Sequence, residues 1–444
     1  MSRIRTLADW LACIETLHPK PIAMGLDRVA AVAQRMSIRI ECPVVTVAGT
    51  NGKGSTCALL EAMYRHAGFR TGLYTSPHLL SFNERIRIAG VDATDDALIE
   101  AFEAVESART ADASDRIADA TARTGNVHAD ATPLTYFEFT TLAGLWLFMR
   151  ARLDVAILEV GLGGRLDAVN IIDADIAVVT TIDIDHVDFL GATREAIGFE
   201  KAGIFRPGKR AICGDLAPPD SLVEHAAAIG APLWRAGRDF TWAAAGAQWR
   251  YAGPGGNRNG LPHPALRGAY QLANAATALA AIDANRERLP IAAGAIRDGL
   301  VHVKLAGRFQ VLPGRPTTVL DVAHNPHAAQ VLAATLGTMG FHPRTLAVFG
   351  MLADKDIEGV VAAVATRIDD WYVAPLPGPR GAAASRIAEA LRAAGVNAAS
   401  VHVSDDIDHA FAAARDAANE TDRIAAFGSF LTVAAALRAV RARR

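Results

Sequence analysis

Cysteine is scarce in this sequence. Its 444 residues include only four cysteines, and no two of them form a C-x-x-C pair. Secreted proteins that depend on disulfides have many more cysteines at closer spacing. The sequence therefore predicts a protein with reduced thiols, which favours a cytoplasmic location. The four cysteines are Cys13, Cys42, Cys57 and Cys213.

An excess of one charge and long apolar runs are also lacking. The net charge is −2 at neutral pH, so no basic field indicates a nucleic acid or an anionic membrane as partner. No apolar run is as long as a membrane span, and Asp9 and Glu15 interrupt the stretch where a signal peptide would need its apolar core. An anionic substrate must therefore be bound by a local cluster of residues.

The sequence does contain enough hydrophobic residues for more than one hydrophobic core. Hydrophobic residues make up 51% of the chain and charged residues 21%, which is an ordinary balance for globular proteins. A chain of this length exceeds the usual size of a single core. Two domains are therefore expected.

One stretch has the layout of a phosphate-binding loop. The β-branched run Val44-Val-Thr-Val-Ala48 leads into Gly49-Thr-Asn-Gly-Lys-Gly-Ser-Thr56, and a helical pattern follows. Glycines let backbone N–H groups approach phosphate oxygens, and a helix N-terminus adds partial positive charge. The spacing departs from G-x-x-x-x-G-K-[ST], because a third glycine separates the lysine from the serine. A glycine-rich turn without phosphate-binding function is the alternative.

The periodicity predicts an α/β fold. Short apolar strands alternate with helices, which is typical of parallel-rich sheets, and the alternation restarts after residue 303. A second, smaller α/β domain is therefore expected. The strands predicted for the first part are 44–48, 71–76, 82–88, 154–160, 176–182 and 210–213, with a strand-built patch at 240–260; those of the second part are 318–321, 345–350, 371–374 and 424–427.

Three further predictions concern single segments. Residues 82–88 alternate apolar and charged side chains, which predicts a half-exposed strand. After a helix predicted at 95–108, residues 110–132 are rich in Ala, Asp, Thr and Arg and lack periodicity, so a mobile surface insertion or a short exposed helix is expected. The helix that carries Lys201 is expected to continue to Arg206, before Pro207.

Three polar residues, Ser76, Glu159 and His186, lie at or just past the carboxyl end of a predicted strand. The carboxyl ends of parallel strands face the ligand, so these side chains would meet near the phosphate loop if their strands are neighbours. Glu159 suits Mg²⁺, which prefers oxygen ligands, although a structural ion pair is the alternative. His186 would be an unusual Mg²⁺ ligand, and a hydrogen-bonded loop residue is its ordinary interpretation.

Two more positions allow both a structural and a functional interpretation. Lys201 lies on an amphipathic helix, where an ion-paired surface lysine is the ordinary case; a buried lysine near a metal would have a lowered pKa and become nucleophilic. Asp321 ends the first strand of the second domain, where a carboxylate commonly bonds a ribose hydroxyl. The alternative is that Asp321 or Asn325 caps the next helix.

Eight short motifs follow one another along the chain: Gly49-Thr-Asn-Gly-Lys-Gly-Ser-Thr, Thr75-Ser-Pro-His-Leu, Glu84-Arg-Ile-Arg-Ile, Leu134-Thr-Tyr-Phe-Glu, Glu159-Val-Gly-Leu-Gly-Gly-Arg-Leu-Asp-Ala, Glu200-Lys-Ala-Gly-Ile-Phe-Arg, Gly307-Arg-Phe-Gln and Asp321-Val-Ala-His-Asn-Pro-His-Ala. Together they resemble the folate branch of the Mur-ligase superfamily, in particular its bifunctional dihydrofolate synthase/folylpolyglutamate synthase family. The similarity covers almost the whole chain, except residues 110–132.

The resemblance implies a P-loop ATP- and folate-binding domain at residues 1–303, a hinge at 304–308 and a Rossmann-like C-terminal ligase domain at 309–444. It also implies two Mg²⁺ ions, with Ser76, Glu159 and His186 as metal ligands. Lys201 is by similarity carbamylated and helps to position the second ion, and Lys53, His186 and Lys201 are implied to be catalytic. The residues implied to bind ATP are Gly49, Asn51, Gly52, Lys53, Gly54, Ser55, Asn274, Arg308, Asp321 and His324.

The pterin or folate is implied to contact a separate group of residues. Phe137 could stack on the flat pterin ring and Thr135 could hydrogen-bond its edge, while core packing is the alternative for Phe137. Two positions depart from the family: Val169, where threonine is frequent, and Ala306, where proline usually stands. They concern local pterin contacts and hinge stiffness. The implied pterin-binding residues are Gly25, Leu26, Leu134, Thr135, Tyr136, Phe137, Asp167 and Ala168.

The activity implied is ATP-dependent addition of L-glutamate to dihydropteroate, forming dihydrofolate, and to reduced folates, forming polyglutamates. These small molecules are the expected partners, and a monomer is the family expectation. A polyglutamate synthase alone and a cell-wall Mur ligase are alternatives; the latter needs a domain for its nucleotide-sugar substrate, and only about forty residues precede the phosphate loop. A non-catalytic nucleotide-binding protein is a third alternative, against which Glu159, His186 and Lys201 argue.

Overall fold

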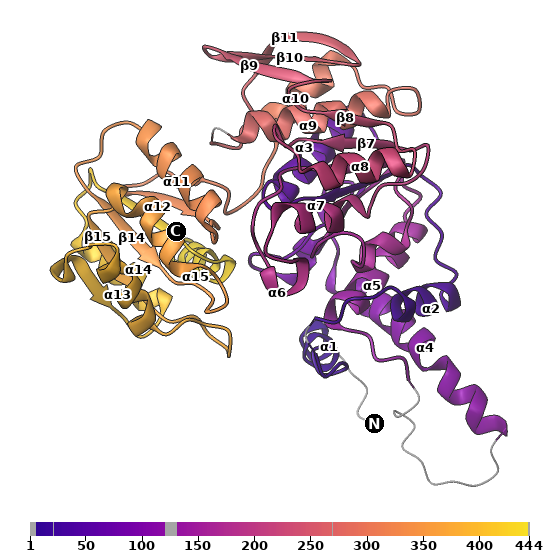
Figure 1. Ribbon diagram of the computed structural model, residues 1–444. Coiled ribbons are helices and arrows are strands. Elements are labelled where there is room, and N and C mark those ends of the chain that lie inside the picture. The colour runs from indigo at the N-terminus through magenta and orange to yellow at the C-terminus, as the bar shows by residue number, and fades with distance from the viewer. Residues whose placement is uncertain (1–5, 21, 120–130, 269, 443–444) are drawn as a thin grey trace. The chain divides into compact units, whose positions relative to one another are not determined.

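The computed structural model describes residues 6–20, 22–119, 131–268 and 270–442, with only the backbone for 112–119 (Figure 1). The chain forms two compact units. The first comprises residues 1–76, 82–263 and 274–302, and the second comprises 77–81, 264–273 and 303–444.

The first unit is built on an eight-stranded sheet with the order β4-β3-β2-β5-β1-β6-β7-β8. The strands in the series β2-β5-β1-β6-β7-β8 are all parallel to their neighbours. Strands β3 and β4 pair antiparallel at one edge of the sheet. The buried apolar strands are those that the sequence predicts, and the α/β fold class is confirmed. The strands are β1 (Val44–Ala48), β2 (Thr71–Tyr74), β3 (Ile86–Ile88), β4 (Val91–Asp92), β5 (Val155–Glu159), β6 (Ile176–Val179), β7 (Arg210–Cys213) and β8 (Leu233–Arg235).

Helices cover both faces of this sheet (Figure 1). One face shares a large apolar core with α1, α2, α4, α5, α7 and α8, and α3 packs on β1, β2 and β5, with α10 outside it. Burial of this apolar surface is the main force that holds the unit together. The helices are α1 (Leu7–Ile14), α2 (Asp27–Arg35), α3 (Lys53–His66), α4 (Asp95–Asp119), α5 (Tyr136–Arg150), α6 (Val187–Leu190), α7 (Arg194–Ala202), α8 (Asp220–Ala228), α9 (Tyr270–Ala284), which belongs to this unit from Asn274 on, and α10 (Ala293–His302).

The Trp- and Gly-rich patch forms a separate three-stranded antiparallel sheet, as its composition predicts. It consists of β9 (Thr241–Ala245), β10 (Gln248–Gly253) and β11 (Gly256–Pro262), and in Figure 1 it lies beyond α9 and α10. The buried carboxylate of Asp283 in α9 accepts a hydrogen bond from the hydroxyl of Tyr251 at 2.9 Å and pairs with Arg258. These contacts anchor the small sheet to α9.

Three sequence predictions about local structure need correction. The predicted strand at 82–88 is only β3, because Phe82–Arg85 forms a 3₁₀ turn that brings residues i and i+3 to one face. There the Arg85 guanidinium lies 5.5 Å from the centre of the Phe82 ring, and both residues are buried. Two helix ends also differ from the predictions.

Helix α4 extends from Asp95 to Asp119, beyond the predicted end near residue 108. The insertion predicted at 110–132 therefore begins as a continuation of this helix, and its central residues 120–130 lie outside the described part of the chain. Helix α7 ends at Ala202 and not at Arg206. Gly203 is the C-cap residue. It packs closely on Arg165, since a Cβ atom on Gly203 would lie 2.3 Å from the Cβ of Arg165.

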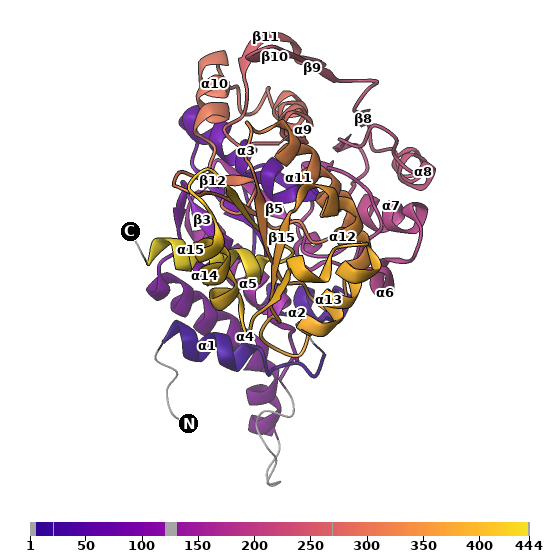
Figure 2. The ribbon, with the colours of Figure 1, turned by 90° about the vertical axis from the view of Figure 1, so that its left-hand side faces the viewer.

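The second unit is a six-stranded sheet with the order β12-β13-β17-β14-β15-β16, parallel except for the edge strand β12. Its two faces carry separate apolar cores, one with α11, α12 and α13 and the other with α14 and α15 (Figure 2). The elements are β12 (Gln310–Leu312), β13 (Thr317–Asp321), α11 (Pro326–Thr338), β14 (Thr345–Phe349), α12 (Ile357–Val364), β15 (Asp370–Val373), α13 (Ala384–Ala393), β16 (Val401–Val403), α14 (Ile407–Ala417), β17 (Arg423–Phe427) and α15 (Phe430–Arg441).

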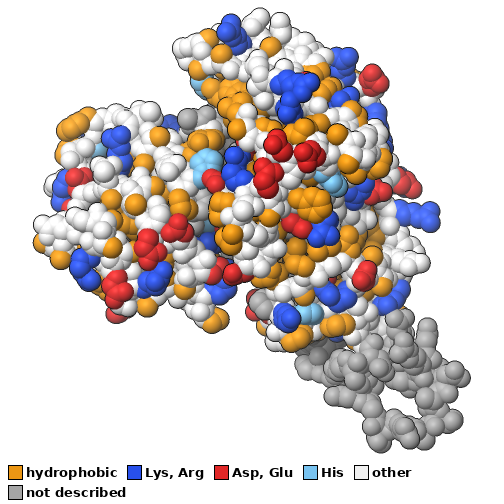
Figure 3. Space-filling view, in the orientation of Figure 1, with side chains coloured by type: hydrophobic (Ala, Val, Ile, Leu, Met, Phe, Trp, Pro, Cys, Tyr) orange, Lys and Arg blue, Asp and Glu red, His pale blue; other side chains and the backbone are white. Residues whose placement is uncertain are grey.

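The surface agrees with the near-neutral composition. Acidic and basic side chains are interspersed over the face shown in Figure 3, without a field of one sign. Among the described residues, no helix has the length and apolarity needed to cross a membrane.

Candidate active site

The phosphate loop connects β1 to α3 at the centre of the first sheet. Gly49 and Gly52 both have positive φ, at +147° and +88°, which only glycine adopts readily. A Cβ atom on Gly49 would lie 1.9 Å from Oγ1 of Thr180, and one on Gly52 would lie 2.5 Å from Oδ1 of Asn274. Both glycines are therefore required by backbone conformation and by space.

The loop is held in shape by the end of the neighbouring strand β6. Thr180 Oγ1 donates to the carbonyl of Asn51 at 2.6 Å, and the N–H of Asn51 donates to Thr181 Oγ1 at 3.2 Å. Thr50 completes the connection, because its N–H donates to the carbonyl of Thr181 at 2.7 Å and its hydroxyl to the carbonyl of Asp183 at 3.0 Å. The sequence analysis did not single out Thr180 and Thr181. Their position directly after a buried strand could have indicated that they belong to the site.

Lys53 is the first residue of α3, and its side chain curls back over the loop. Its Nζ donates to the carbonyl of Gly49 at 2.8 Å and to that of Thr50 at 3.2 Å. Gly54 and Ser55 follow in the first turn, where Ser55 is buried. The cation, the backbone N–H groups of the first helical turn and the hydroxyl thus share one small region, which can receive anionic oxygens.

Strand β2, which leads to Ser76, and strand β5, which ends at Glu159, are neighbours in the sheet. Because β2 and β5 pair in parallel, their carboxyl ends coincide, and the N–H of Ser76 donates to Oε2 of Glu159 at 3.2 Å. Glu159 is almost fully buried. The next strands in the sheet are β1, which leads into the phosphate loop, and β6.

His186 follows β6 and caps α6 in a left-handed conformation with φ 53°. Its N–H donates to Oδ1 of Asp185 at 2.8 Å, and its Nε2 lies 3.9 Å from Oδ2 of the same carboxylate. Arg194 and Asp215 support this loop: Arg194 Nε donates to the carbonyl of Ile182 at 2.9 Å, and Asp215 accepts from the N–H of Ile182 at 2.8 Å. Sequence reasoning did not single out either residue.

Lys201 is buried near the C-terminus of α7, with an exposed fraction of 3%. Burial, together with the positive charge of Lys53, lowers the pKa of its amine to about 7, and the carboxylates of Asp185 and Asp167 only partly oppose this. An ion-paired surface lysine is therefore excluded here. At neutral pH a large share of the Lys201 amine is uncharged.

The glycine turn after β5 is organised by Asp167. Its carboxylate accepts hydrogen bonds from the N–H groups of Leu162 at 2.8 Å and Val169 at 3.0 Å. Burial raises the pKa of Asp167 to about 6, although these N–H donors pull it down. Ala168 and Val169 lie buried in the short turn that follows.

The aromatic residue implied to contact the pterin lies over this turn. The Phe137 ring is half-buried; a Cβ atom on Gly161 would come within 2.6 Å of its Cζ, and its centre lies 6.1 Å from that of Tyr74. Phe137 is therefore only partly enclosed by the core, beside the end of β5.

Other residues implied to bind the pterin also have structural roles. Thr135 caps α5 by accepting from the N–H of Glu138 at 3.2 Å, and Leu134 is fully buried. Arg28 pairs with Glu138 at 2.9 Å and so ties α2 to the start of α5. The elements that carry Gly25, Leu26 and Phe137 are thereby linked, and Tyr136 is half-buried next to Phe137.

In the second unit, Asp321 lies at the end of β13. Its carboxylate accepts from the N–H groups of Phe309 at 2.7 Å and Ala323 at 2.8 Å, and burial raises its pKa against the influence of Arg308. Asp321 therefore fastens the segment before β12 to the end of β13. Asn325, and not Asp321, caps α11.

Arg308 and His324 both lie close to the ring of Phe430. The Arg308 guanidinium is 5.2 Å from the centre of the Phe430 ring, and the His324 ring is 6.3 Å from it. The Nδ1 of His324 lies 2.8 Å from the carbonyl of Val322. Sequence reasoning missed Phe430, which follows the tight turn at Gly428 and Ser429 after the last strand.

The comparisons with known proteins agree with this architecture. Residues 107–214 match the Mur ligase middle domain, and residues 307–430 match the Mur ligase glutamate ligase domain. The chain is 44% identical to the dihydrofolate synthase/folylpolyglutamate synthase of Escherichia coli K12, over 99% of this chain and 96% of that protein.

Solved structures are similar over the same length. Escherichia coli FolC in complex with DHPP and ADP superposes with a TM-score of 0.90 at 44% identity, covering 99% of both chains. A bifunctional folylpolyglutamate synthase/dihydrofolate synthase with Mn, AMPPNP and L-glutamate bound gives a TM-score of 0.87 at 42% identity, covering 98% of both chains.

Proposed function

Because this chain belongs to the dihydrofolate synthase/folylpolyglutamate synthase family, we propose that it ligates L-glutamate both to dihydropteroate and to reduced folates. It is an ATP-dependent carboxylate–amine ligase of the Mur-ligase fold. The observation that carries the proposal is the phosphate loop with Lys53 beside the strand-end pair of Ser76 and Glu159. We also propose that it acts as a cytoplasmic monomer.

Amide synthesis sets the requirements of the site. A carboxylate does not react with an amine, so its oxygen first attacks the γ-phosphorus of ATP, the bond to ADP breaks, and an acyl phosphate forms. The uncharged α-amine of glutamate then attacks the acyl carbon, and a tetrahedral intermediate expels phosphate. Positioning and charge neutralisation dominate catalysis of the phosphoryl transfer.

The ATP-binding role is assigned to Gly49, Asn51, Gly52, Lys53, Gly54 and Ser55. The Lys53 ammonium would leave the carbonyls of Gly49 and Thr50 to neutralise the transferred phosphoryl group. Asn274 lies against Gly52 and so borders the same loop. In the second unit, Arg308, Asp321 and His324 surround the start of β12 and α11, and we assign them to the nucleotide as well.

The residues proposed to hold Mg²⁺ fit that ion in their chemistry. The Ser76 hydroxyl and the Glu159 carboxylate are hard oxygen donors, and the hydrogen bond from the Ser76 backbone N–H to Glu159 places the two residues next to each other. His186 would add a nitrogen donor. No group of three or more His, Cys, Asp and Glu that could hold a metal occurs in the described part of the chain. Oxygens of the bound ATP and water would supply the further ligands. Mg²⁺ would supply charge neutralisation at the phosphates.

The low pKa of Lys201 supports its carbamylation. Its uncharged amine can attack CO₂, which forms an N–C bond and releases one proton, and the product is a carbamate anion in place of a cation. A carbamate close to Lys53 and Asp185 would serve a second Mg²⁺ that a plain ammonium would repel. Lys53, His186 and Lys201 are the residues proposed to take part in catalysis.

The half-buried Phe137 ring supports a pterin site in the first unit. A flat ring could stack on its open part, with Gly25, Leu26, Leu134, Thr135, Tyr136, Asp167 and Ala168 around it. Because dihydropteroate is short, its pterin must be held close to the phosphate loop, and the Gly161 turn that supports Phe137 directly follows β5.

The domain assignment completes the proposal. We propose that residues 1–303 bind ATP and folate, that 309–444 form the ligase domain, and that 304–308 act as a hinge. Closure about such a hinge would exclude water from the acyl phosphate, which would otherwise hydrolyse.

Product identification tests the function directly. The protein is incubated with ATP, Mg²⁺ and glutamate, plus either dihydropteroate or a reduced folate, and the products are identified by mass spectrometry. Dihydrofolate in the first reaction and a glutamate-extended folate in the second are expected. Extension of the folate alone would reduce the enzyme to a polyglutamate synthase, and ATP hydrolysis without any new amide would overturn the assignment.

A further inference from the structure

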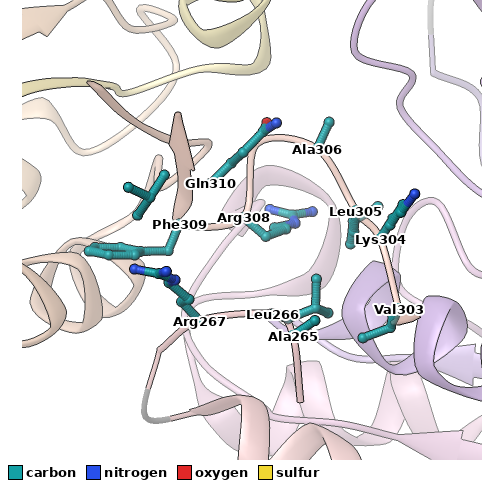
Figure 4. A pocket seen from close by; sticks show the side chains of 11 residues that line it. Ala265, Leu266, Arg267, Val303, Lys304, Leu305, Ala306, Arg308, Phe309 and Gln310 are labelled. Atoms are coloured by element: carbon teal, nitrogen blue, oxygen red, sulfur yellow. The ribbon is translucent and has the colours of Figure 1, made fainter. Parts of the chain in front are cut away.

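A pocket of about 310 Å³ lies within the second unit, between the segment that precedes α9 and the segment that leads into β12 (Figure 4). Three of its lining residues are cationic, namely Arg267, Lys304 and Arg308, and no aspartate or glutamate lines it. In Figure 4, Arg308 lies between Arg267 on one side and Lys304 on the other. The cations are thus spread along the pocket.

These three cations differ in how far their charge is already balanced. Arg308 interacts with the Asp321 carboxylate and stacks on Phe430. Arg267 and Lys304 are exposed, and neither forms a hydrogen bond or ion pair with any residue in the described ranges. Two positive charges therefore remain available to a ligand in a concave site, where attraction is stronger than on an open surface.

We propose that this pocket binds the α-carboxylates of the oligo-γ-glutamyl tail of a folate substrate. The inference rests on the proposed function, since only a ligase that extends polyglutamates meets such a tail. Each cycle of that reaction adds one glutamate and so one α-carboxylate. The negative charge of the substrate grows along its length, and a row of separated cations matches a row of separated carboxylates.

Two other anions compete for this assignment, and each fits less well. Free glutamate carries an ammonium group, which three cations without a carboxylate would repel, whereas a glutamyl residue within the tail has an uncharged amide nitrogen. The ATP triphosphate is compact and has its own cradle at Lys53 and the N-terminus of α3. Of the three cations only Arg308 is assigned to the nucleotide, so Arg267 and Lys304 remain for the tail. The spread of cations across the pocket favours a long, flexible polyanion.

The test compares KM values for reduced folates that carry one, three or five γ-glutamyl residues. Arg267→Ala and Lys304→Ala are each expected to raise KM for the longer substrates about two- to fivefold, as for the loss of one partly exposed ion pair. KM for dihydropteroate, for ATP and for free glutamate should not change. Salt should raise KM for the long substrates more in the wild type than in a variant that carries both Arg267→Ala and Lys304→Ala.

Arg392→Ala is the matched control, because Arg392 is an exposed arginine of the same unit on α13, which packs on β15 and β16 at the sheet edge opposite β12. It should leave every KM unchanged. Calorimetric binding of a triglutamyl folate gives a second measure that needs no turnover. A loss that is equal at all tail lengths, or a rise in KM for ATP or glutamate alone, would overturn the proposal. Absence of any ligation by the wild type would instead count against the proposed function.

Discussion

The hydroxyl of Thr180 stands where a side chain on Gly49 would have to go. A Cβ atom at Gly49 would lie 1.9 Å from Thr180 Oγ1, and the same hydroxyl donates to the carbonyl of Asn51 at 2.6 Å. The end of β6 and the phosphate loop therefore define each other's conformation. Neither can change shape without displacing the other.

This relationship predicts the effect of Gly49→Ala. The methyl group would collide with Thr180, and φ of +147° would strain the backbone, so the loop should lose its shape and ATP should bind at least about tenfold more weakly. Calorimetry with AMPPNP measures this. Gly294→Ala is the control, because a Cβ there meets nothing within 4 Å and the residue lies in α10. Unchanged affinity of a folded Gly49→Ala protein would contradict the loop geometry.

Lys53→Ala should leave a folded protein and lower ligation about a hundredfold or more, because the phosphoryl group loses its fixed cation during transfer. Steady-state ADP release with dihydropteroate and glutamate measures the loss, and thermal unfolding checks the fold. Lys209→Ala removes a lysine whose partner is Asp175 at the surface, and should remain active. Near-normal ligation by folded Lys53→Ala would remove this lysine from the catalytic residues.

Carbamylation of Lys201 predicts a ¹³C NMR carbamate signal when the protein is equilibrated with labelled bicarbonate. The signal should be absent in Lys201→Ala, whose turnover should fall far more than its ATP affinity. A small carboxylic acid should restore part of the activity by filling the vacated anionic position. An unmodified Lys201 paired with a carboxylate in a metal-bound crystal structure would refute this prediction.

The lowered pKa of Lys201 also predicts a pH dependence of stability in CO₂-free buffer. The amine has a pKa of about 7 in the folded protein and its ordinary value of 10.5 when unfolded, so between these values the unfolded chain binds more protons. The free energy of unfolding should therefore rise with pH across this window. Urea titrations should show that the free energy of unfolding of the wild type rises relative to that of Lys201→Met from pH 7 to pH 10. Parallel pH profiles would mean that Lys201 is not buried as an amine.

Phe137→Ala should raise KM for dihydropteroate about two- to tenfold, as expected for loss of one aromatic stack, and should affect glutamate addition to a reduced folate much less. Trp146→Ala is a matched control, because Trp146 is a partly buried aromatic residue of the same helix that stacks on Arg150. Equal losses in both activities would make Phe137 a structural residue only.

Local pattern made some of the site predictable. The glycines of the phosphate loop, the β-branched β1 and the carboxylate at the end of β5 are legible in the sequence, because strand and helix periodicity depend on neighbouring residues. The 3₁₀ turn at Phe82–Arg85 could not be predicted from the sequence, since alternation of apolar and charged residues does not distinguish such a turn from a strand. In this turn Arg85 stacks on Phe82 and on Tyr136, and Tyr136 is far along the chain, so a short window of sequence does not contain this contact.

The sequence by itself determined the family, the α/β class and the residue types that ATP-dependent ligation needs. Tertiary structure alone decided that β2, β5, β1 and β6 lie side by side, which places Ser76 against Glu159 and Thr180 against Gly49. It also decided that Lys201 is buried near Lys53, and this lowers its pKa. The physical reason is that strand order, burial and the field of distant charges arise from contacts between residues far apart in the chain, and no short window of sequence contains them.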